Sequence, residues 1–183
     1  MVIKPRRGRM LFKIENVDES NFQDTPNPCR CCLYWQTNGE FGEQTLKPEM
    51  ETKKRKWFNK VAKEFGSCIK IAYLDNVPIG FIQYAPAKFF PRLKEYAAGP
   101  SSEDAVFIAC LYISNRKERG KGLGTKMLEN LIAELKEREF KAVETFARTS
   151  SENNPSGPLK LYLKHNFKIK NDKDDFPLVR LEF

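Results

Sequence analysis

The sequence predicts an α/β fold in which a mixed sheet is flanked by helices. The chain has 183 residues and 21.2 kDa, which suits a single domain with a sizeable core, so we expect one domain over residues 1–183. With 40% hydrophobic and 31% charged residues, the composition is that of a folded globular protein. Strand-like apolar runs alternate with helical apolar patterns, and an early hairpin adds antiparallel pairing, so the sheet should be mixed.

Residues 1–47 are predicted to form an elaborated N-terminal segment. A first strand is expected at residues 10–14, and an irregular stretch with several Pro and Gly follows from about Asn21 to Lys47. This stretch holds three cysteines within four residues, Cys29, Cys31 and Cys32. Three thiols could ligate zinc, but the paired CxxC spacing is absent and the chain has one histidine, so free thiols are the preferred interpretation and no metal is predicted.

The next segment predicts a helix and then a hairpin. From Lys47 to Gly66, apolar residues recur at three- and four-residue spacing, and Gly66 suits a C-terminal cap. The basic run 53–56 in this helix is interpreted as a solvated face, with a nucleic-acid patch as the alternative. Two strand-like runs, 68–74 and 79–84, are joined by a short turn and predict an antiparallel hairpin.

The second half of the chain predicts four further strands and two helices. The unbroken apolar run 105–113 is typical of a central strand buried on both faces. A Gly-rich turn and an amphipathic helix to about Arg138 follow, and then a short strand at 142–147. A second helix begins after residues 154–158, and strands near 167–169 and 179–181 end the pattern.

The turn 116–124 has the features of an anion site. It lies between the buried strand and the start of a helix, where backbone N–H groups converge and the helix dipole favours negative charge. Glycines allow the backbone to approach a phosphate, and the surrounding arginines and lysines raise the potential. The order of residues is neither that of a P-loop nor that of a G-x-G-x-x-G dinucleotide site.

The pattern Arg119-x-x-Gly122-x-Gly124 resembles the cofactor signature of the GNAT superfamily of acetyl-CoA-dependent N-acetyltransferases. A later motif, Leu161-Tyr162-x-x-x-Asn166-Phe167, resembles that superfamily's Leu-Tyr-x-x-x-Gly-Phe helix end. Asn166 replaces the usual glycine, and asparagine tolerates the left-handed conformation of a helix cap. The resemblance covers about 68–170, the expected acetyl-CoA-binding core, and implies a twisted, mostly antiparallel GNAT-like sheet.

This resemblance also implies a cofactor site. The main chain of Leu111 and Ile113 should pair with the pantetheine arm of acetyl-CoA, and the amides of the turn should hold the pyrophosphate. Asn153 or Asn154 matches a position where family members have an asparagine touching the cofactor, and Asn154 is our choice. The predicted cofactor-binding residues are Leu111, Tyr112, Ile113, Arg119, Gly120, Lys121, Gly122, Leu123, Gly124, Thr125 and Asn154.

Two residues are predicted to act in catalysis. Transfer to an amine needs protonation of the departing thiolate, and Tyr162 matches the position of the family's proton donor. The alternative for Tyr162 is a packed aromatic whose hydroxyl has a backbone partner. Glu144 is the expected base, because a carboxylate in an apolar strand can have its pKa raised, although a solvent-facing glutamate fits the alternation equally. Glu103, Asp104 and a water chain are further options.

The predicted function is transfer of the acetyl group from acetyl-CoA to a primary amine of a small molecule or protein. The charge of +8 favours a polyanionic ligand, which could also be nucleic acid. The alternatives are therefore a noncatalytic acyl-CoA-binding module and a nucleic-acid-associated protein with a zinc site. The acceptor pocket is expected at the Cys29–Trp35 region and at the loop with Phe89, Phe90 and Tyr96.

The remaining expectations concern partners and location. No stretch approaches the roughly 20 apolar residues of a membrane span, and no signal peptide is recognised, so a cytoplasmic protein is expected. Nucleic acid is not the favoured partner. The pattern leaves open whether the chain is a monomer or a homodimer.

Overall fold

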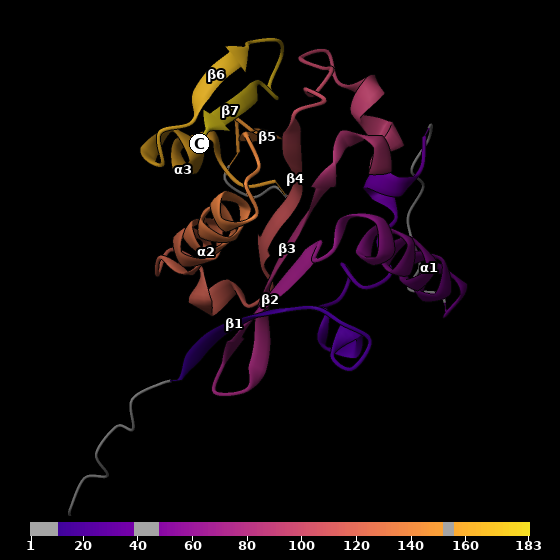
Figure 1. Cartoon of the computed structure of the whole chain (residues 1–183). Coiled ribbons are helices and arrows are strands. Elements are labelled where there is room, and N and C mark those ends of the chain that lie inside the picture. The colour runs from indigo at the N-terminus through magenta and orange to yellow at the C-terminus, as the bar shows by residue number, and fades with distance from the viewer. Residues whose placement is uncertain (1–10, 39–47, 152–155) are drawn as a thin grey trace, which may run out of the picture.

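A computed structural model describes residues 11–38, 48–151 and 156–183. Its centre is a seven-stranded sheet in the order β1-β2-β3-β4-β5-β7-β6 (Figure 1). Five of the six strand pairs are antiparallel, and β4 and β5 are parallel, so the predicted mixed, mostly antiparallel sheet is confirmed. The strands are β1 Phe12–Asn16, β2 Ile69–Leu74, β3 Val77–Pro86, β4 Ala105–Ile113, β5 Ala142–Phe146, β6 Lys168–Asn171 and β7 Leu178–Glu182.

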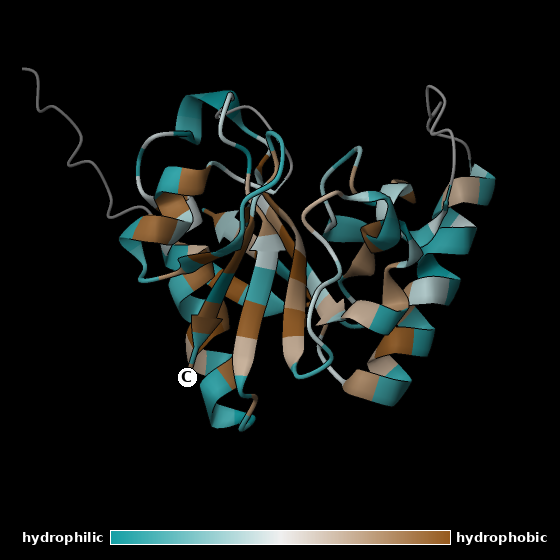
Figure 2. Ribbon diagram, turned by 90° about the horizontal axis from the view of Figure 1, so that it is seen from above, coloured by the Kyte–Doolittle hydropathy of each residue, from teal (hydrophilic) through white to brown (hydrophobic). Residues whose placement is uncertain are grey.

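Helices cover both faces of the sheet (Figures 1 and 2). On one face, Phe58 and Val61 of α1 pack into a core with the N-terminal segment. On the other face, Met127 of α2 and Tyr162 of α3 belong to a second core. The α-helices are α1 Pro48–Phe65, α2 Leu123–Glu137 and α3 Leu159–Lys164, and the short 3₁₀ helices are Phe22–Asp24, Tyr34–Gln36, Ala87–Phe89, Pro91–Glu95 and Arg116–Glu118.

The parallel strands β4 and β5 stop pairing partway along β4. Only Ala105–Phe107 pair with β5, whereas β4 itself continues to Ile113. On its other side β4 stays paired with β3, with an irregularity in the register next to Gln83. The last residues of β4 therefore have a β-sheet neighbour on one edge and face the Gly-rich turn and α3 on the other.

Several local predictions are confirmed. The helix expected over 47–66 runs over Pro48–Phe65, and the hairpin turns at Asp75 and Asn76, whose φ angles of 50° and 65° are typical of the two-residue turns that match strand twist. Asn166 has φ 65°, the left-handed cap conformation expected of it. The first strand begins two residues later than expected, at Phe12.

Residues 11–38 of the N-terminal segment are part of the packed body. Val17, Phe22 and Trp35 are buried in the core on the α1 face. Phe89 and Phe90 are buried in the same core, and the Tyr96 ring stacks on Phe146 at a centroid distance of 4.4 Å. In the described parts of the chain no helix is long and apolar enough to cross a membrane.

Candidate active site

The Gly-rich turn forms an open cradle of backbone amides at the start of α2. Gly120 and Gly122 have φ angles of 76° and 80°, which L side chains rarely adopt, and nothing lies within 4 Å of a Cβ built at either position. The first intrahelical bond is from Lys126 N–H to Gly122 O at 3.1 Å, so the amides before Lys126 have no helical carbonyl to bond. This is the geometry that binds phosphates.

A cavity of about 930 Å³ extends from this cradle along the open edge of β4 to α3. We call it the cofactor pocket. It brings together all the predicted cofactor-binding residues except Lys121, whose Nζ lies 3.0 Å from Glu118, and Asn154, which lies outside the described residues together with Asn153. Its lining also includes Arg116, Glu118, Gly157, Pro158, Lys160, Leu161 and Lys164.

The main chain of β4 presents alternate residues to this pocket. Ser114 N–H donates to Ile79 O at the start of β3. Because backbone groups alternate between the two edges of a strand, the N–H and C=O groups of Tyr112 and Cys110 also face β3. The N–H and C=O groups of Leu111 and Ile113 then point to the opposite, open edge. Arg119 Nε donates to Ile113 O at 2.8 Å, which ties the turn to the end of the strand.

Tyr162 does not line the cofactor pocket but lies next to Gly157, which does. Its side chain is fully buried, and its hydroxyl donates a hydrogen bond to Ser156 O. A Cβ built on Gly157 would lie 3.5 Å from the Tyr162 hydroxyl and 3.7 Å from Leu111 Cδ2. Burial raises the pKa of Tyr162, so the phenol holds its proton at neutral pH.

The raised pKa expected for Glu144 is wrong. Burial alone would raise the pKa of Glu144. The hydrogen bonds from Ser102, Lys170 and Ser101 lower the pKa by more than burial raises it, so the pKa lies below its ordinary value. The carboxylate accepts from Ser101 Oγ at 2.8 Å and Ser102 Oγ at 2.6 Å, and it lies 3.0 Å from both Lys170 Nζ and Arg180 Nη1. Glu144 lines none of the three cavities described in this section, and its oxygens are engaged by this network.

The two alternative bases at the start of β4, Glu103 and Asp104, do not have the buried setting expected of a general base. Asp104 pairs with Arg180 at 3.0 Å, and this hydrogen bond lowers the pKa of Asp104. Glu103 is exposed on the turn before β4. Asp104 and Glu144 are therefore paired with Arg180, and Glu103 is exposed to solvent.

A second, smaller cavity of about 160 Å³ lies on the α1 face of the sheet. We call it the acceptor pocket. Tyr112 of β4 lines both cavities and is the one residue common to their linings. The predicted Cys29–Trp35 region contributes, whereas Phe89, Phe90 and Tyr96 do not line it. Its residues are Pro28, Cys29, Cys32, Trp35, Gln36, Lys54, Phe81, Gln83, Cys110 and Tyr112.

Sequence reasoning missed Lys54, because the run 53–56 was interpreted as a solvated face. Lys54 is only 2% exposed, and its Nζ donates to Gln83 Oε1. Burial lowers the pKa of Lys54. The signal was present in the sequence, since Lys54 precedes Phe58 by four residues and Val61 by seven and so shares the apolar face of α1.

The cysteine cluster is divided between two environments. Cys29 and Cys32 line the acceptor pocket, whereas Cys31 is buried without lining it. Burial raises the pKa of Cys29 to about 12. Within residues 11–38, 48–151 and 156–183, no group of three His, Cys, Asp or Glu side chains is arranged to hold a metal ion.

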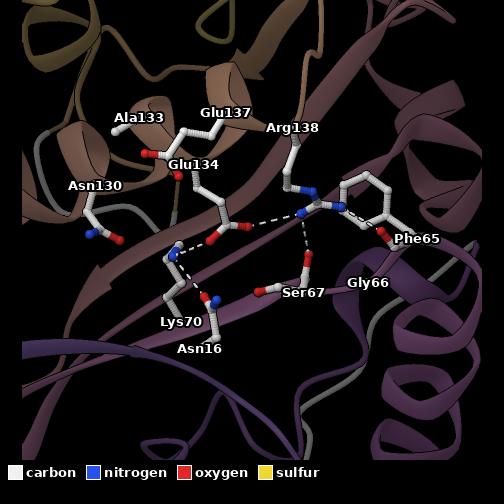
Figure 3. A pocket seen from close by; sticks show the side chains of 10 residues that line it. All are labelled: Asn16, Phe65, Gly66, Ser67, Lys70, Asn130, Ala133, Glu134, Glu137 and Arg138. Atoms are coloured by element: carbon white, nitrogen blue, oxygen red, sulfur yellow. Dashed lines mark hydrogen bonds and ion pairs between the residues drawn. The ribbon is translucent and has the colours of Figure 1, made fainter.

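A third cavity, of about 530 Å³, lies between β2, α2 and the end of α1, and is polar (Figure 3). Glu134 bridges Lys70 at 2.5 Å and Arg138 at 3.0 Å, and Arg138 donates to the Ser67 carbonyl at 3.1 Å. These side chains point toward one another in Figure 3, and the single carboxylate of Glu134 is shared by the two cations. The cluster ties α2 to β2 and to the end of α1.

Comparison with known proteins identifies the family. The model of the Acetyltransferase (GNAT) family matches residues 16–167, so the chain belongs to this family. It is therefore an acyltransferase of the class that uses acetyl-CoA as its cosubstrate. No curated protein sequence matches the chain.

Solved structures show the same fold. The PaiA N-acetyltransferase of Thermoplasma acidophilum in complex with coenzyme A is 16% identical, with 95% of this chain and 100% of that chain covered and a TM-score of 0.61. An N-acetyltransferase of Staphylococcus aureus is 18% identical, with 94% and 98% covered and a TM-score of 0.63. YncA of Salmonella typhimurium, a putative acetyltransferase with acetyl-CoA, is 14% identical, with 93% of both chains covered and a TM-score of 0.61.

Proposed function

We propose that the chain transfers the acetyl group of acetyl-CoA to a primary amine bound in the acceptor pocket. The observation that supports this most strongly is that Tyr112, in the part of β4 that does not pair with β5, lines both cavities. A thioester lying along the outer edge of β4 and an amine entering from the α1 face would meet there, which allows direct attack without an acyl-enzyme.

The cofactor pocket would hold acetyl-CoA by its main chain. The amides of Gly122, Leu123 and Gly124 are suited to the pyrophosphate, and Arg119 adds charge beside them. The outward N–H and C=O groups of Leu111 and the N–H of Ile113 are suited to the amide groups of the pantetheine arm, which would extend the sheet like an added strand, while Ile113 O already accepts from Arg119.

The chemistry then needs one proton donor. The amine nitrogen bonds to the thioester carbonyl carbon, the C–S bond breaks, and its electron pair leaves with sulfur. Tyr162, which retains its proton at neutral pH, would give it to the thiolate and regain one from solvent, while the nitrogen loses its extra proton to water. This requires the hydroxyl to exchange its bond to Ser156 O for one to sulfur.

A turnover assay tests this function. The purified chain is incubated with acetyl-CoA and a panel of primary amines, release of the CoA thiol is followed, and the product is identified by mass spectrometry. We expect an N-acetylated amine and stoichiometric thiol. Tight binding of acetyl-CoA with no acetylated product from small amines or peptides would instead favour a noncatalytic acyl-CoA-binding module.

A further inference from the structure

The acceptor pocket contains a buried lysine without a counter-ion among the described residues. Within that part of the chain, Lys54 Nζ donates to Gln83 Oε1, lies 4.9 Å from the centroid of the Trp57 ring and forms no ion pair with a carboxylate. The ionisable groups that face Lys54 are the thiols of Cys29, Cys32, Cys68 and Cys110. Burial raises the pKa of Cys29, Cys68 and Cys110, so these three thiols are neutral at physiological pH and supply no negative charge.

Two glutamine side chains in the same pocket have unpaired amide atoms. Gln83 is 1% exposed, and its Nε2 has no hydrogen-bond partner among the described residues. Both Nε2 and Oε1 of Gln36 are likewise buried and unpaired within that part of the chain. Buried polar groups of folded proteins are almost always hydrogen-bonded, and a site built to pair with a substrate leaves its polar groups unpaired when the substrate is absent.

Three of these polar groups share one complement. Lys54 Nζ and the Nε2 atoms of Gln83 and Gln36 all offer N–H donors, whereas Gln36 Oε1 is an acceptor that needs a donor. Burial lowers the pKa of Lys54, and a bound anion would oppose this by stabilising the charged form. A carboxylate supplies the missing negative charge together with two acceptor oxygens, whereas a neutral carbonyl would satisfy the donors and leave Lys54 without a counter-ion.

The rest of the pocket limits the size and polarity of the ligand. Trp35, Phe81 and Pro28 give it apolar walls. Its volume of about 160 Å³ is much less than that of a drug-sized site. A small amine with one branched aliphatic or aromatic group fits these limits.

We propose that the acceptor is a small amino acid whose carboxylate is bound by Lys54, Gln83 and Gln36, with its apolar side chain against Trp35 and Phe81. This inference rests on the proposed acetyl transfer, because it assigns the substrate class of that reaction. The amino group would then lie toward Tyr112, which lines both the acceptor pocket and the cofactor pocket.

Three matched acceptors separate the carboxylate from the rest of the molecule: L-leucine, L-leucinamide and 3-methylbutylamine, with the corresponding phenylalanine series in parallel. We expect kcat/KM for the amino acid to exceed that for its amide and for the decarboxylated amine by at least roughly tenfold. Equal rates across each series, or transfer only to the amines that lack a carboxylate, would overturn the inference and leave acetyl transfer itself intact.

Variants of the polar groups supply the second readout. Lys54→Met keeps the side chain's length and should lower kcat/KM for the amino acid by roughly thirtyfold or more, with a much smaller loss for 3-methylbutylamine and no change in acetyl-CoA affinity. Gln83→Glu places a carboxylate next to Lys54 and should block the amino acid in the same way. Lys56→Met, an exposed position on the same helix, is the matched control and should behave as wild type. An equal loss for all three acceptors in Lys54→Met would contradict carboxylate binding.

A binding measurement keeps the inference testable if no acceptor turns over. 4-Methylpentanoate and its amide are titrated while tryptophan fluorescence is followed, since Trp35 lines the pocket. We expect saturable quenching by the acid, little by the amide, and loss of the response to the acid in Lys54→Met. Identical responses to acid and amide would refute the carboxylate site whatever the outcome of the transfer assay.

Discussion

Replacing Glu144 by glutamine tests whether this residue supports the fold or reacts with the substrate. Its carboxylate is completely buried and lies 3.0 Å from both Arg180 and Lys170, with Ser101 and Ser102 donating to the same oxygens. The substitution keeps the size of the side chain and removes the charge, so the two cations lose their shared partner.

The size of the stability loss depends on the partners that Arg180 and Lys170 keep after the substitution. Breaking a buried pair by removing one partner costs about 3–5 kcal/mol. Arg180 keeps Asp104 at 3.0 Å, and Lys170 is 41% exposed and can be hydrated, so the lower end of this range, about 3 kcal/mol, applies. For a chain of this size each kcal/mol shifts the melting temperature by about 2–4 °C, which gives a loss of about 6–12 °C.

Thermal unfolding followed by circular dichroism at pH 7 measures this loss. Asp104→Asn is the matched control, because it removes the exposed partner of Arg180 and should cost no more than about 1 kcal/mol. At a temperature where both proteins are folded, the Glu144→Gln variant should bind acetyl-CoA and turn over. An unchanged melting temperature combined with a hundredfold loss of kcat would refute the structural role and restore Glu144 as a base.

The lowered pKa of Glu144 also predicts how the stability difference between wild type and Glu144→Gln changes with pH. The pKa of Glu144 is lowered in the folded chain, so its contribution is fully present above its ordinary value near 4.5 and is lost as the pH falls through the folded value. The difference in stability between wild type and Glu144→Gln should therefore be largest at neutral pH and shrink on acidification. A difference that grew below pH 4 would contradict the lowered pKa.

Two further predictions concern the proton donor and the buried thiols. Tyr162→Phe should lower kcat by roughly a hundredfold with little change in acetyl-CoA affinity, since one positioned acid contributes about 10²–10⁴, and an unchanged rate would remove Tyr162 from this role. Cys29 and Cys68, each with a pKa of about 12, should react with iodoacetamide at pH 8 at least roughly a hundredfold more slowly than free cysteine, as read by mass spectrometry. Rapid labelling of Cys68 in the folded chain would contradict its burial.

The elements that could be predicted from sequence are those with a local signal. Apolar spacing defined α1, the two-residue turn at Asp75 and Asn76 defined the hairpin, and an unbroken apolar run defined β4. The cradle at Gly120 and Gly122 could also be predicted, because a turn between strand and helix fixes the direction of its amides by itself.

The features that could not be predicted depend on partners distant in the chain. Glu144 was interpreted from its own strand, but its pKa is set by burial, by serines that precede β4 and by Lys170 of β6, and its carboxylate also pairs with Arg180 of β7. Lys54 was grouped with its charged neighbours, although its position on the helix places it with Phe58. The pairing of Lys54 with Gln83 joins α1 to β3, and no spacing in the sequence encodes that contact.

The most direct test of the central claim is calorimetric titration of acetyl-CoA into wild type and Gly122→Val. A valine at φ 80° is strained, and its side chain would enter the space where the pyrophosphate is expected. Gly66→Val, also at positive φ but outside the cofactor pocket, is the matched control for backbone strain. We predict micromolar binding to wild type and to Gly66→Val and at least roughly thirtyfold weaker binding to Gly122→Val. Absence of binding to wild type, or equal affinity in all three proteins, would contradict the assignment of the cradle to acetyl-CoA.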